Sequence, residues 1–414
     1  MPRGAVGSYT VPGFAVKKDA LRILFLQAQT DWAGSPPSVV QHLLVSNLDR
    51  RAFDVHVACS VWPHGRPTEP YLHYEKTPDI HLRPTNFGSR IFESTKRDAV
   101  KGLLATGLAV PTTLGGLVRY AKRHRIEIVQ GSEDPRDALS GAFIARLTDA
   151  KHVFHLHAKC GSWMRPSVFR AMRSAEAVVG ISRFVADSAV SIGCKPDRTH
   201  HAHNAIDLAR WDQRIDGQPV RDEFSIPAGA IVFANVAKIR PWKGQELTVR
   251  ALATIKDRIP DFRYLVVGSG SDGSDSGYGT RLQGLADELG IGRQVILTGV
   301  RSDIAAVLAA CDFSVMPFFE EGFGLAVIEA MAMGKAVIAL DNGGPGELVE
   351  EGRSGLLSQP DDVEGLARNI RALATDDRLR AEMGAYGRRR VEEYFNPQRL
   401  ARDFERIYGE VRAA

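Results

Sequence analysis

Short apolar runs alternate along the chain with longer segments in which apolar positions recur every three or four residues. The short runs are typical of buried parallel strands, and the longer segments are typical of helices that pack on a sheet. In the first half we expect strands at Leu21–Gln27, Phe53–Cys59, Ile80–Pro84, Glu127–Gln130, Val153–Leu156 and Ala177–Ile181. In the second half the pattern restarts, with strands expected at Ile231–Ala237, Tyr264–Val267, Val295–Thr298, Asp312–Met316 and Lys335–Leu340. The sequence therefore predicts parallel α/β domains.

Helical patterns separate most of these strands. The expected helices are Ser38–Leu48, Thr95–Arg125, Arg136–Leu147, Ser182–Ser191, Lys243–Arg258, Asp303–Ala310, Gly324–Met333 and Gln398–Val411. The exception is Trp62–Pro78, whose Pro and His content predicts an irregular segment.

The length of 414 residues predicts two domains, because single hydrophobic cores stop growing below that size. We expect residues 1–20 to form a loose tail, residues 21–215 the first domain and residues 216–395 the second. Leu208–Pro219 is the expected linker. Four scattered cysteines show no metal or redox spacing, which suits a reducing cytosol. No apolar run approaches the roughly twenty residues of a membrane span.

Charge is unevenly divided between the two halves. Residues 1–215 hold 29 Lys and Arg against 19 Asp and Glu, whereas residues 216–414 hold 24 against 30. The basic first half either reflects an ordinary surface bias or meets anionic acceptors or a lipid surface. Thr95–Arg125 leaves the same choice open, since its basic end is explained by the helix dipole or by membrane contact. No feature indicates a nucleic-acid partner.

The stretch from Phe318 to Glu350 carries two candidate ligand loops on successive strand–helix units. Glu321 lies at the mouth of one expected helix, where backbone N–H groups and the helix dipole favour a carboxylate. Glu329 lies inside that helix among apolar residues, where an unpaired charge is costly. Gly343 and Gly344 form the second turn, before Pro345, and leave room for a phosphate near the backbone. Helix capping explains either motif alone, but together they favour a ligand site.

Further candidates lie where other expected strands end. Lys238, Arg240 and Lys243 share one loop, and three neighbouring cations repel one another unless an anion lies between them. His157 follows a strand of the first half, as does Gly34, although no dinucleotide fingerprint surrounds Gly34.

The order of these motifs resembles family 4 of the glycosyltransferases. The resemblance rests on Lys238, Lys243-Gly244, Gly268-Ser269-Gly270, Thr298-Gly299, Glu321-Gly322-Phe323-Gly324, Glu329-Ala330-Met331 and Gly343-Gly344. It covers nearly the whole chain from Leu21 and is strongest over Ile231–Pro360. It implies the GT-B fold, in which two Rossmann-like, doubly wound domains face across a cleft. A final helix, here within residues 396–414, crosses back onto the first domain.

The resemblance also implies roles for individual residues. Glu321 matches the acid that holds donor-sugar hydroxyls, and Glu329 matches the acid that holds the ribose. Lys243 matches a phosphate-binding lysine, whose usual arginine partner is replaced here by Lys238. The remaining matched positions are His157 beside the sugar, Gly34 in the first-strand loop, Val300 and Arg301 at the base, and Gly322, Phe323, Gly324, Leu325, Gly343 and Gly344 as backbone contacts.

The implied reaction is transfer of a hexose-type sugar from a nucleoside diphosphate, with UDP or GDP most expected, to an acceptor hydroxyl with retention. The acceptor would be a glycan, a lipid-linked molecule or a small molecule, in surface polysaccharide or glycoconjugate synthesis. We expect no cofactor and no metal, with the two lysines and helix N-termini stabilising the leaving diphosphate. The expected location is the cytoplasm, including the inner face of the membrane. A non-catalytic sugar-nucleotide-binding relative, a phosphorylase and a sugar-nucleotide epimerase remain alternatives.

Overall fold

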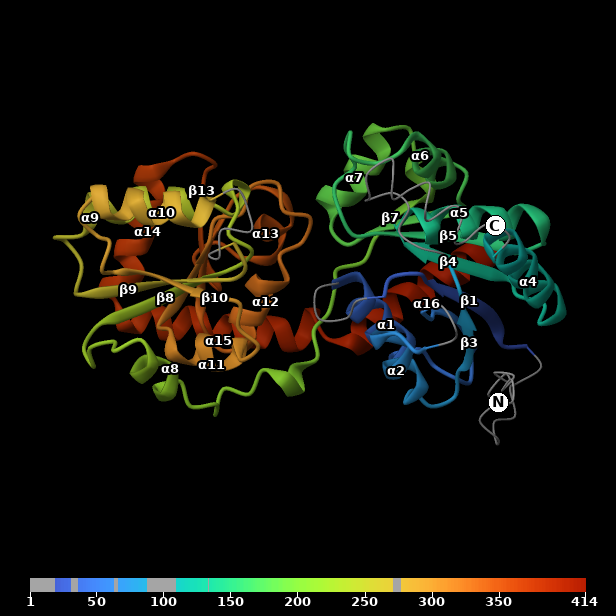
Figure 1. The fold of residues 1–414 in the computed structure, drawn as a ribbon, viewed down its shortest axis with the longest axis horizontal. Helices are drawn as coiled ribbons and strands as arrows, with labels where there is room; N and C mark the ends of the chain where they lie inside the picture. The colour runs from blue at the N-terminus through green and yellow to red at the C-terminus, as the bar shows by residue number, and fades with distance from the viewer. Residues whose placement is uncertain (1–18, 31–35, 63–65, 88–108, 133, 271–276) are drawn as a thin grey trace. The chain divides into compact units, whose positions relative to one another are not determined.

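The computed structural model of the protein describes residues 19–30, 36–62, 66–87, 109–132, 134–270 and 277–414 (Figure 1). The chain divides into two compact units. Unit 1 comprises Met1–Ile181, Val185–His203 and Leu400–Ala414, and unit 2 comprises Ser182–Phe184 and Asn204–Arg399.

Unit 1 contains a seven-stranded sheet in the order β3-β2-β1-β4-β5-β6-β7. Its strands are β1 (Leu21–Gln27), β2 (Phe53–Ser60), β3 (His81–Thr85), β4 (Ile128–Ser132), β5 (Lys151–Leu156), β6 (Ala177–Gly180) and β7 (Thr199–His201). Its helices are α1 (Pro36–Asn47), α2 (Glu69–Glu75), α4 (Ala109–Arg123), α5 (Pro135–Leu147), α6 (Pro166–Arg173) and most of α7 (Arg183–Ser191). The strand order reverses between β1 and β4, so this is a doubly wound sheet.

Unit 2 contains a six-stranded sheet in the order β10-β9-β8-β11-β12-β13. Its strands are β8 (Ile231–Val236), β9 (Phe262–Val267), β10 (Val295–Gly299), β11 (Phe313–Met316), β12 (Ala336–Leu340) and β13 (Gly355–Ser358). Its helices are α8 (Gln218–Glu223), α9 (Gln245–Ile255), α10 (Tyr278–Glu288), α11 (Ile304–Ala310), α12 (Leu325–Ala332), α13 (Gly343–Leu348), α14 (Val363–Thr375) and α15 (Asp377–Tyr394). The order reverses between β8 and β11.

All strand pairs of both sheets are parallel among the described residues. The predicted fold class, two parallel Rossmann-like sheets, is confirmed.

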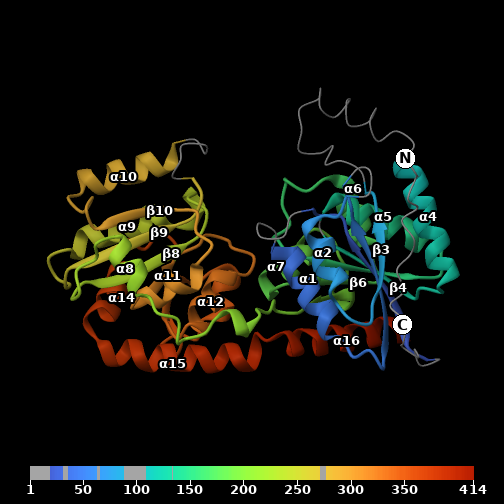
Figure 2. The ribbon, with the colours of Figure 1, turned by 60° about the horizontal axis from the view of Figure 1, so that its bottom comes forward.

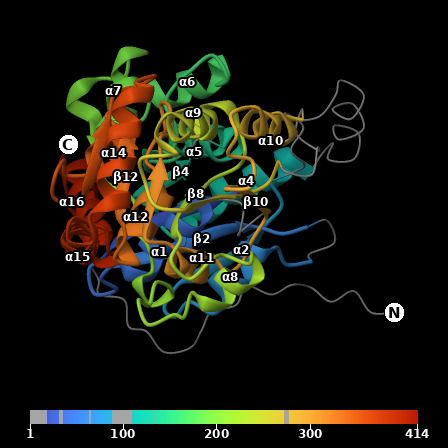
Figure 3. The ribbon, with the colours of Figure 1, turned by 90° about the vertical axis from the view of Figure 1, so that its left-hand side faces the viewer.

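Aromatic side chains stack through the core of unit 2. The Phe233 ring lies 4.8 Å from Phe313 and 5.5 Å from Tyr264, and all three are fully buried. Helix α9 packs beside both α10 and α14 (Figure 3), and α15 packs against α12 and β12 (Figure 2).

The last helix, α16 (Pro397–Ala413), contributes core residues to unit 1 from Leu400 onward. Tyr408 is fully buried, its ring lies 6.5 Å from that of Phe25, and its hydroxyl donates a hydrogen bond to Gln130. Asp49 N–H donates to the Glu405 carboxylate at 2.9 Å. One face of α16 is therefore part of the core of unit 1, although the helix lies far from β1 in the sequence.

The expectation of an irregular Trp62–Pro78 is wrong, because α2 lies within it. Thr68 caps the helix by accepting a hydrogen bond from the Tyr71 N–H, and Pro70 lies in the first turn, where no helical hydrogen bond needs its missing N–H. Tyr71 and Tyr74 are buried beneath the helix. Proline content alone was misleading here.

Candidate functional site

The loops at the carboxyl ends of the unit 2 strands hold most of the candidate residues. The β8 loop runs from Ala237 to Gly244, and the β11 loop from Pro317 to Gly324. These two strands flank the reversal of strand order, where ligands bind in open α/β sheets. The β12 loop, which contains Gly343, lies next to them.

Backbone contacts hold the β8 and β11 loops together. The Phe319 N–H donates to the Trp242 carbonyl at 2.9 Å. Gly244 has φ +69°, and a Cβ at this position would lie 2.1 Å from the Pro317 carbonyl oxygen. Only glycine fits such a contact with such a backbone conformation. The two loops therefore form one surface.

Lys243 and Glu321 meet on that surface. The Lys243 ammonium donates to the Glu321 carboxylate, and it also lies 4.4 Å from the centre of the Phe318 ring. Lys243 lies in a 3₁₀ turn, Pro241–Lys243, and α9 begins after it at Gln245, so the expectation that Lys243 begins the helix is wrong. The turn explains how the lysine points back to the next loop.

The glycines of the β12 loop pack against the β11 loop. The Gly344 N–H donates to the Glu321 carbonyl at 2.8 Å. A Cβ on Gly343 would lie 2.6 Å from that carbonyl oxygen, and a Cβ on Gly344 would lie 2.4 Å from the Phe323 Cα. In the structure these glycines therefore make room for the neighbouring loop.

Helix α12 begins directly behind the β11 loop. Gly324 precedes it with φ +94° and without a side-chain cap, so the first N–H groups, which start at Leu325, lie at an uncapped end. Gly322, Phe323 and Gly324 are buried. Glu320, just before Glu321, has φ +48°, an uncommon backbone conformation that concentrates at functional sites.

Glu329 lies one turn into α12 and keeps a small exposed fraction. Burial raises the pKa of its carboxyl to about 7, and the nearby positive charge of Arg210 opposes that shift. A hydrogen-bond donor from a ligand would favour the ionised form. This environment is typical of an acid whose ionised form is stabilised when hydroxyl groups donate hydrogen bonds to it.

The remaining unit 2 candidates lie around these loops. Lys238 is exposed at the start of the β8 loop, and Val300, after β10, is 77% exposed. The Arg301 guanidinium pairs with Glu223 and Asp303, each at 2.7 Å. The Arg301 side chain is thus engaged in ion pairs within the protein.

His157 lies in unit 1, directly after β5. Its ring lies 4.0 Å from that of His155, which in turn packs on Phe404 of α16 at 4.9 Å. Burial lowers the pKa of His157 to about 3, so the ring is neutral at pH 7. Gly34 lies outside the described residues.

Comparison with known proteins follows the same division of the chain. The protein-family model described as "Glycosyl transferases group 1" matches residues 218–390. A second family model, described as "Glycosyltransferase Family 4", matches residues 38–210. Together they account for most of the chain. The protein belongs to glycosyltransferase family 4.

Several relatives of this family 4 member carry specific names. The chain is 34% identical over 194 residues to a D-inositol 3-phosphate glycosyltransferase of Corynebacterium jeikeium, a match over 46% of each chain. It thus spans less than half the length of that relative. It is 28% identical to a GDP-mannose-dependent alpha-(1-6)-phosphatidylinositol monomannoside mannosyltransferase of Mycolicibacterium smegmatis, over 68% of this chain and 76% of the relative.

A solved structure gives the fold of the family 4 member. The Anabaena protein HepE in complex with UDP and glucose superposes with a TM-score of 0.73 at 21% identity, over 94% of this chain and 99% of that one. The fold is therefore GT-B, as the sequence predicted. Within the described residues, no helix is both long and apolar enough to cross a bilayer.

Two buried polar residues that support the β8 loop of this family 4 member were not predicted from the sequence. The Asn235 amide donates to the Lys243 carbonyl at 3.1 Å, and the Gln245 amide donates to Asn235 at 3.3 Å and to the Lys238 carbonyl at 3.1 Å. Both are fully buried and fix the backbone of the β8 loop. A polar Asn inside the apolar run Ile231–Val236 was the signal available in the sequence.

Proposed function

We propose that the protein transfers a hexose-type sugar from a nucleoside diphosphate sugar to an acceptor hydroxyl, with retention at the anomeric carbon. The single observation that carries this proposal is the Lys243–Glu321 pair on interlocked loops at the strand-order reversal of unit 2. The cation suits a diphosphate and the carboxylate suits sugar hydroxyls. A UDP-bound structural neighbour and a GDP-mannose-dependent relative support this donor class.

Donor binding would exchange the partners of this pair. Lys243 would turn from Glu321 to the diphosphate, and Glu321 would accept hydrogen bonds from sugar hydroxyls. Lys238 and the N-terminal N–H groups of α12 would add positive charge as the leaving diphosphate gains negative charge. We assign the ribose to Glu329 and the base to the backbone of Val300 and Arg301.

We assign to His157 the role that the resemblance implies, a neutral ring beside the donor sugar. A neutral imidazole beside a sugar donates or accepts a hydrogen bond without placing a second positive charge near an oxocarbenium-like transition state. This role agrees with the lowered pKa of His157.

The acceptor we propose is a glycan, lipid-linked or small-molecule hydroxyl on the cytoplasmic side. The amino ends of β1, β4 and β5 in unit 1 border a basic cavity of about 1070 Å³. Its charged lining residues are Arg22, Lys122, Arg125, Arg146, Lys151 and Arg412 against Glu127 and Asp149. This excess of cations supports contact with an anionic membrane surface.

The direct test is a thermal-shift screen with UDP, GDP, ADP and their sugars. A ligand that binds the folded state raises the unfolding midpoint, so one nucleotide class should raise it well above the others. No shift with any of these nucleotides would overturn the proposal. Anomeric configuration of the product, read by NMR coupling, then separates retention from inversion.

Lysine at position 238, where the resemblance expects arginine, keeps one alternative open: a sugar-nucleotide-binding relative without activity. Lys238→Arg should preserve or raise transfer, because it restores a two-pronged donor to the phosphates. Donor binding without turnover in the wild type and in this variant would favour the alternative. Conversion of donor in the absence of acceptor would indicate an epimerase.

A further inference from the structure

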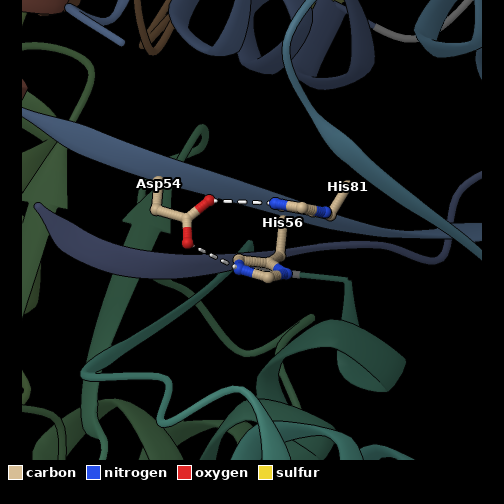
Figure 4. A group of neighbouring side chains, drawn as sticks. All are labelled: Asp54, His56 and His81. Carbon is tan, nitrogen blue, oxygen red and sulfur yellow. Dashed lines mark ion pairs between the residues drawn. The ribbon is translucent and has the colours of Figure 1, made fainter. Parts of the chain in front are cut away.

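Two histidines and an aspartate gather on β2 and β3 of unit 1, near the amino ends of these strands (Figure 4). Asp54 and His56 are two residues apart on β2, so their side chains share a face, and His81 is the register partner of His56 on β3. The Asp54 carboxylate lies 3.4 Å from His56 Nε2 and 3.1 Å from His81 Nε2. Among the described residues, this is the group whose three donor atoms all lie within 4.8 Å of one another.

The cluster is largely withdrawn from water. His56 is 1% exposed, and only 12% of the Asp54 side chain and 32% of the His81 side chain are exposed. The His56 Nε2 atom is buried and makes no hydrogen bond within the described part of the chain, so its lone pair or proton is available to a ligand.

Tyr120 of α4 orients the buried ring. Its hydroxyl lies 2.8 Å from His56 Nδ1. Either atom can be the donor in this contact, depending on the histidine tautomer. With the proton on Nδ1, the Nε2 lone pair faces the Asp54 carboxylate, where a cation would lie; with the proton on Nε2, the phenol donates to Nδ1 and the N–H faces Asp54. Such an outer hydrogen bond is usual for metal-binding histidines.

We propose that Asp54, His56 and His81 bind one divalent transition-metal ion of the zinc type, through His56 Nε2, His81 Nε2 and an Asp54 oxygen. Two imidazoles and a carboxylate are a donor set that Zn²⁺ accepts, with water as the fourth ligand. The two imidazole rings are stacked at 4.4 Å with an 18° angle between their planes. Binding therefore requires the His81 ring to tilt, and its partial exposure leaves room for that movement.

Neighbouring positive charges lower the expected affinity of the site for a divalent metal ion but do not prevent binding. Arg22 is already paired with Glu127 at 3.8 Å, and the Arg83 guanidinium stacks over the Tyr120 ring at 4.9 Å. His124 lies 5.2 Å from His56, ring centre to ring centre. The Arg22 charge is thus paired with a carboxylate, and the Arg83 guanidinium is held on the Tyr120 ring.

The ion would have a structural role. β3 is the edge strand of the sheet, and Tyr120 belongs to the helix α4. A metal bound across β2 and β3 would fasten this edge to the sheet, at the opposite end of the strands from His157. It would stabilise unit 1 and take no part in sugar transfer.

The test measures Zn²⁺ binding to the full chain, by competition with a chromophoric chelator, and Co²⁺ binding by visible absorption. We expect one equivalent of each, and a rise in the thermal midpoint of roughly 5–10 °C at a hundredfold excess over the dissociation constant. His81→Ala and Asp54→Asn should each weaken binding by more than roughly 100-fold, and Tyr120→Phe by roughly 10-fold to 100-fold.

His201→Ala is the matched control, because His201 is an exposed histidine on β7 of the same unit. It should bind both metals like the wild type. The partly exposed His81 is the primary target, since replacing the buried His56 risks the fold. No binding by the wild type, or equal binding by His81→Ala, Asp54→Asn and His201→Ala, would overturn the site.

Discussion

For the candidate residues on the β8 and β11 loops, the side chains that they contact matter more than their positions within their own elements. Glu321 was predicted as a carboxylate facing helix N–H groups, whereas the structure pairs it with Lys243. The pair keeps two opposite charges 78 positions apart in the sequence in one place. Under the proposed function, each charge would be preorganised for a donor that carries both phosphate and hydroxyl groups.

Replacing either partner should stop transfer while the fold persists. We expect Glu321→Ala and Lys243→Ala each to lower kcat/KM by at least about 100-fold, because the lost group stabilises charge or orients the sugar. Steady-state kinetics with circular dichroism as the fold check measure this. Glu246→Ala is the control, since Glu246 lies in the first turn of α9 and pairs with Arg250 on the same helix. Near-wild-type kinetics in either target variant would refute the site.

Glu329 gives a residue-scale prediction with a defined sign. Its pKa is raised, so the folded state holds more protons than the unfolded chain between about pH 4.5 and 7. The stabilisation of the protonated carboxyl is complete below pH 4.5 and is lost as pH rises through 7. Glu329→Gln, which mimics the protonated form, should therefore be more stable than wild type at pH 8 by about 1–3 kcal/mol and equal to it near pH 4.5.

Urea unfolding of unit 2 at the two pH values measures this difference. Glu288→Gln, on the exposed face of α10, is the control and should show no comparable gain at pH 8. If Glu329→Gln were less stable than wild type at pH 8, Glu329 would have a charge partner within the protein. The same variant should bind nucleotide more weakly.

At the scale of elements, glycines set how closely the loops approach. Gly244, Gly343 and Gly344 each face backbone atoms of another loop within 2.6 Å of where a Cβ would lie. The sequence predicts that the glycines of the β12 loop leave room for a phosphate near the backbone. Their contacts with the β11 loop give a second reason for glycine, one that depends on the fold alone.

Gly244→Ala should therefore destabilise unit 2 by about 2 kcal/mol or more, since the left-handed backbone and the Pro317 carbonyl both oppose a Cβ. It should also lower donor affinity by shifting Lys243. Chemical unfolding and nucleotide titration report the two effects separately. Gly229→Ala is the control, because nothing lies within 4 Å of its Cβ position. A Gly244→Ala variant as stable as Gly229→Ala would contradict the loop contact.

At the scale of the whole molecule, the buried histidines of unit 1 make its stability decrease as the pH falls below neutral. Burial lowers the pKa of His42 and His152 to about 4 and that of His157 to about 3. The unfolded chain binds these protons near pH 6.5 while the folded chain does not. Stability is therefore present above pH 6.5 and is lost as pH falls below it, by roughly 1–2 kcal/mol per histidine at pH 5.

His152 offers the sharpest test, because both its ring nitrogens are buried and have no hydrogen-bond partner among the described residues. His152→Leu should match or exceed wild-type stability at pH 7 and lose less between pH 7 and pH 5. Urea midpoints at both values measure this, with the exposed His201→Leu as control. Equal pH dependence in wild type and His152→Leu would show that His152 is protonated in the folded state.

Much of the architecture follows from the sequence alone. The period of apolar positions predicted eleven strands of the two sheets to within a few residues, as at Leu21–Gln27 and at Phe313–Met316, because a strand buried on both faces must be apolar throughout. The short edge strands β7 and β13 were not predicted. The motif order determined the family. Helix α2 was not predicted, because its local signal is only a Thr cap before a proline. The helix also depends on the burial of two tyrosines, which the tertiary structure provides.

Only the tertiary structure decided which residues meet. The Lys243–Glu321 pair, the Asn235–Gln245 support and the gathering of Asp54, His56 and His81 join segments separated along the chain or set on different strands. The same holds for Tyr408, which fills the core of unit 1 from the end of the chain. Local sequence encodes the period and the caps of each element, but strand order and register decide which side chains share a surface.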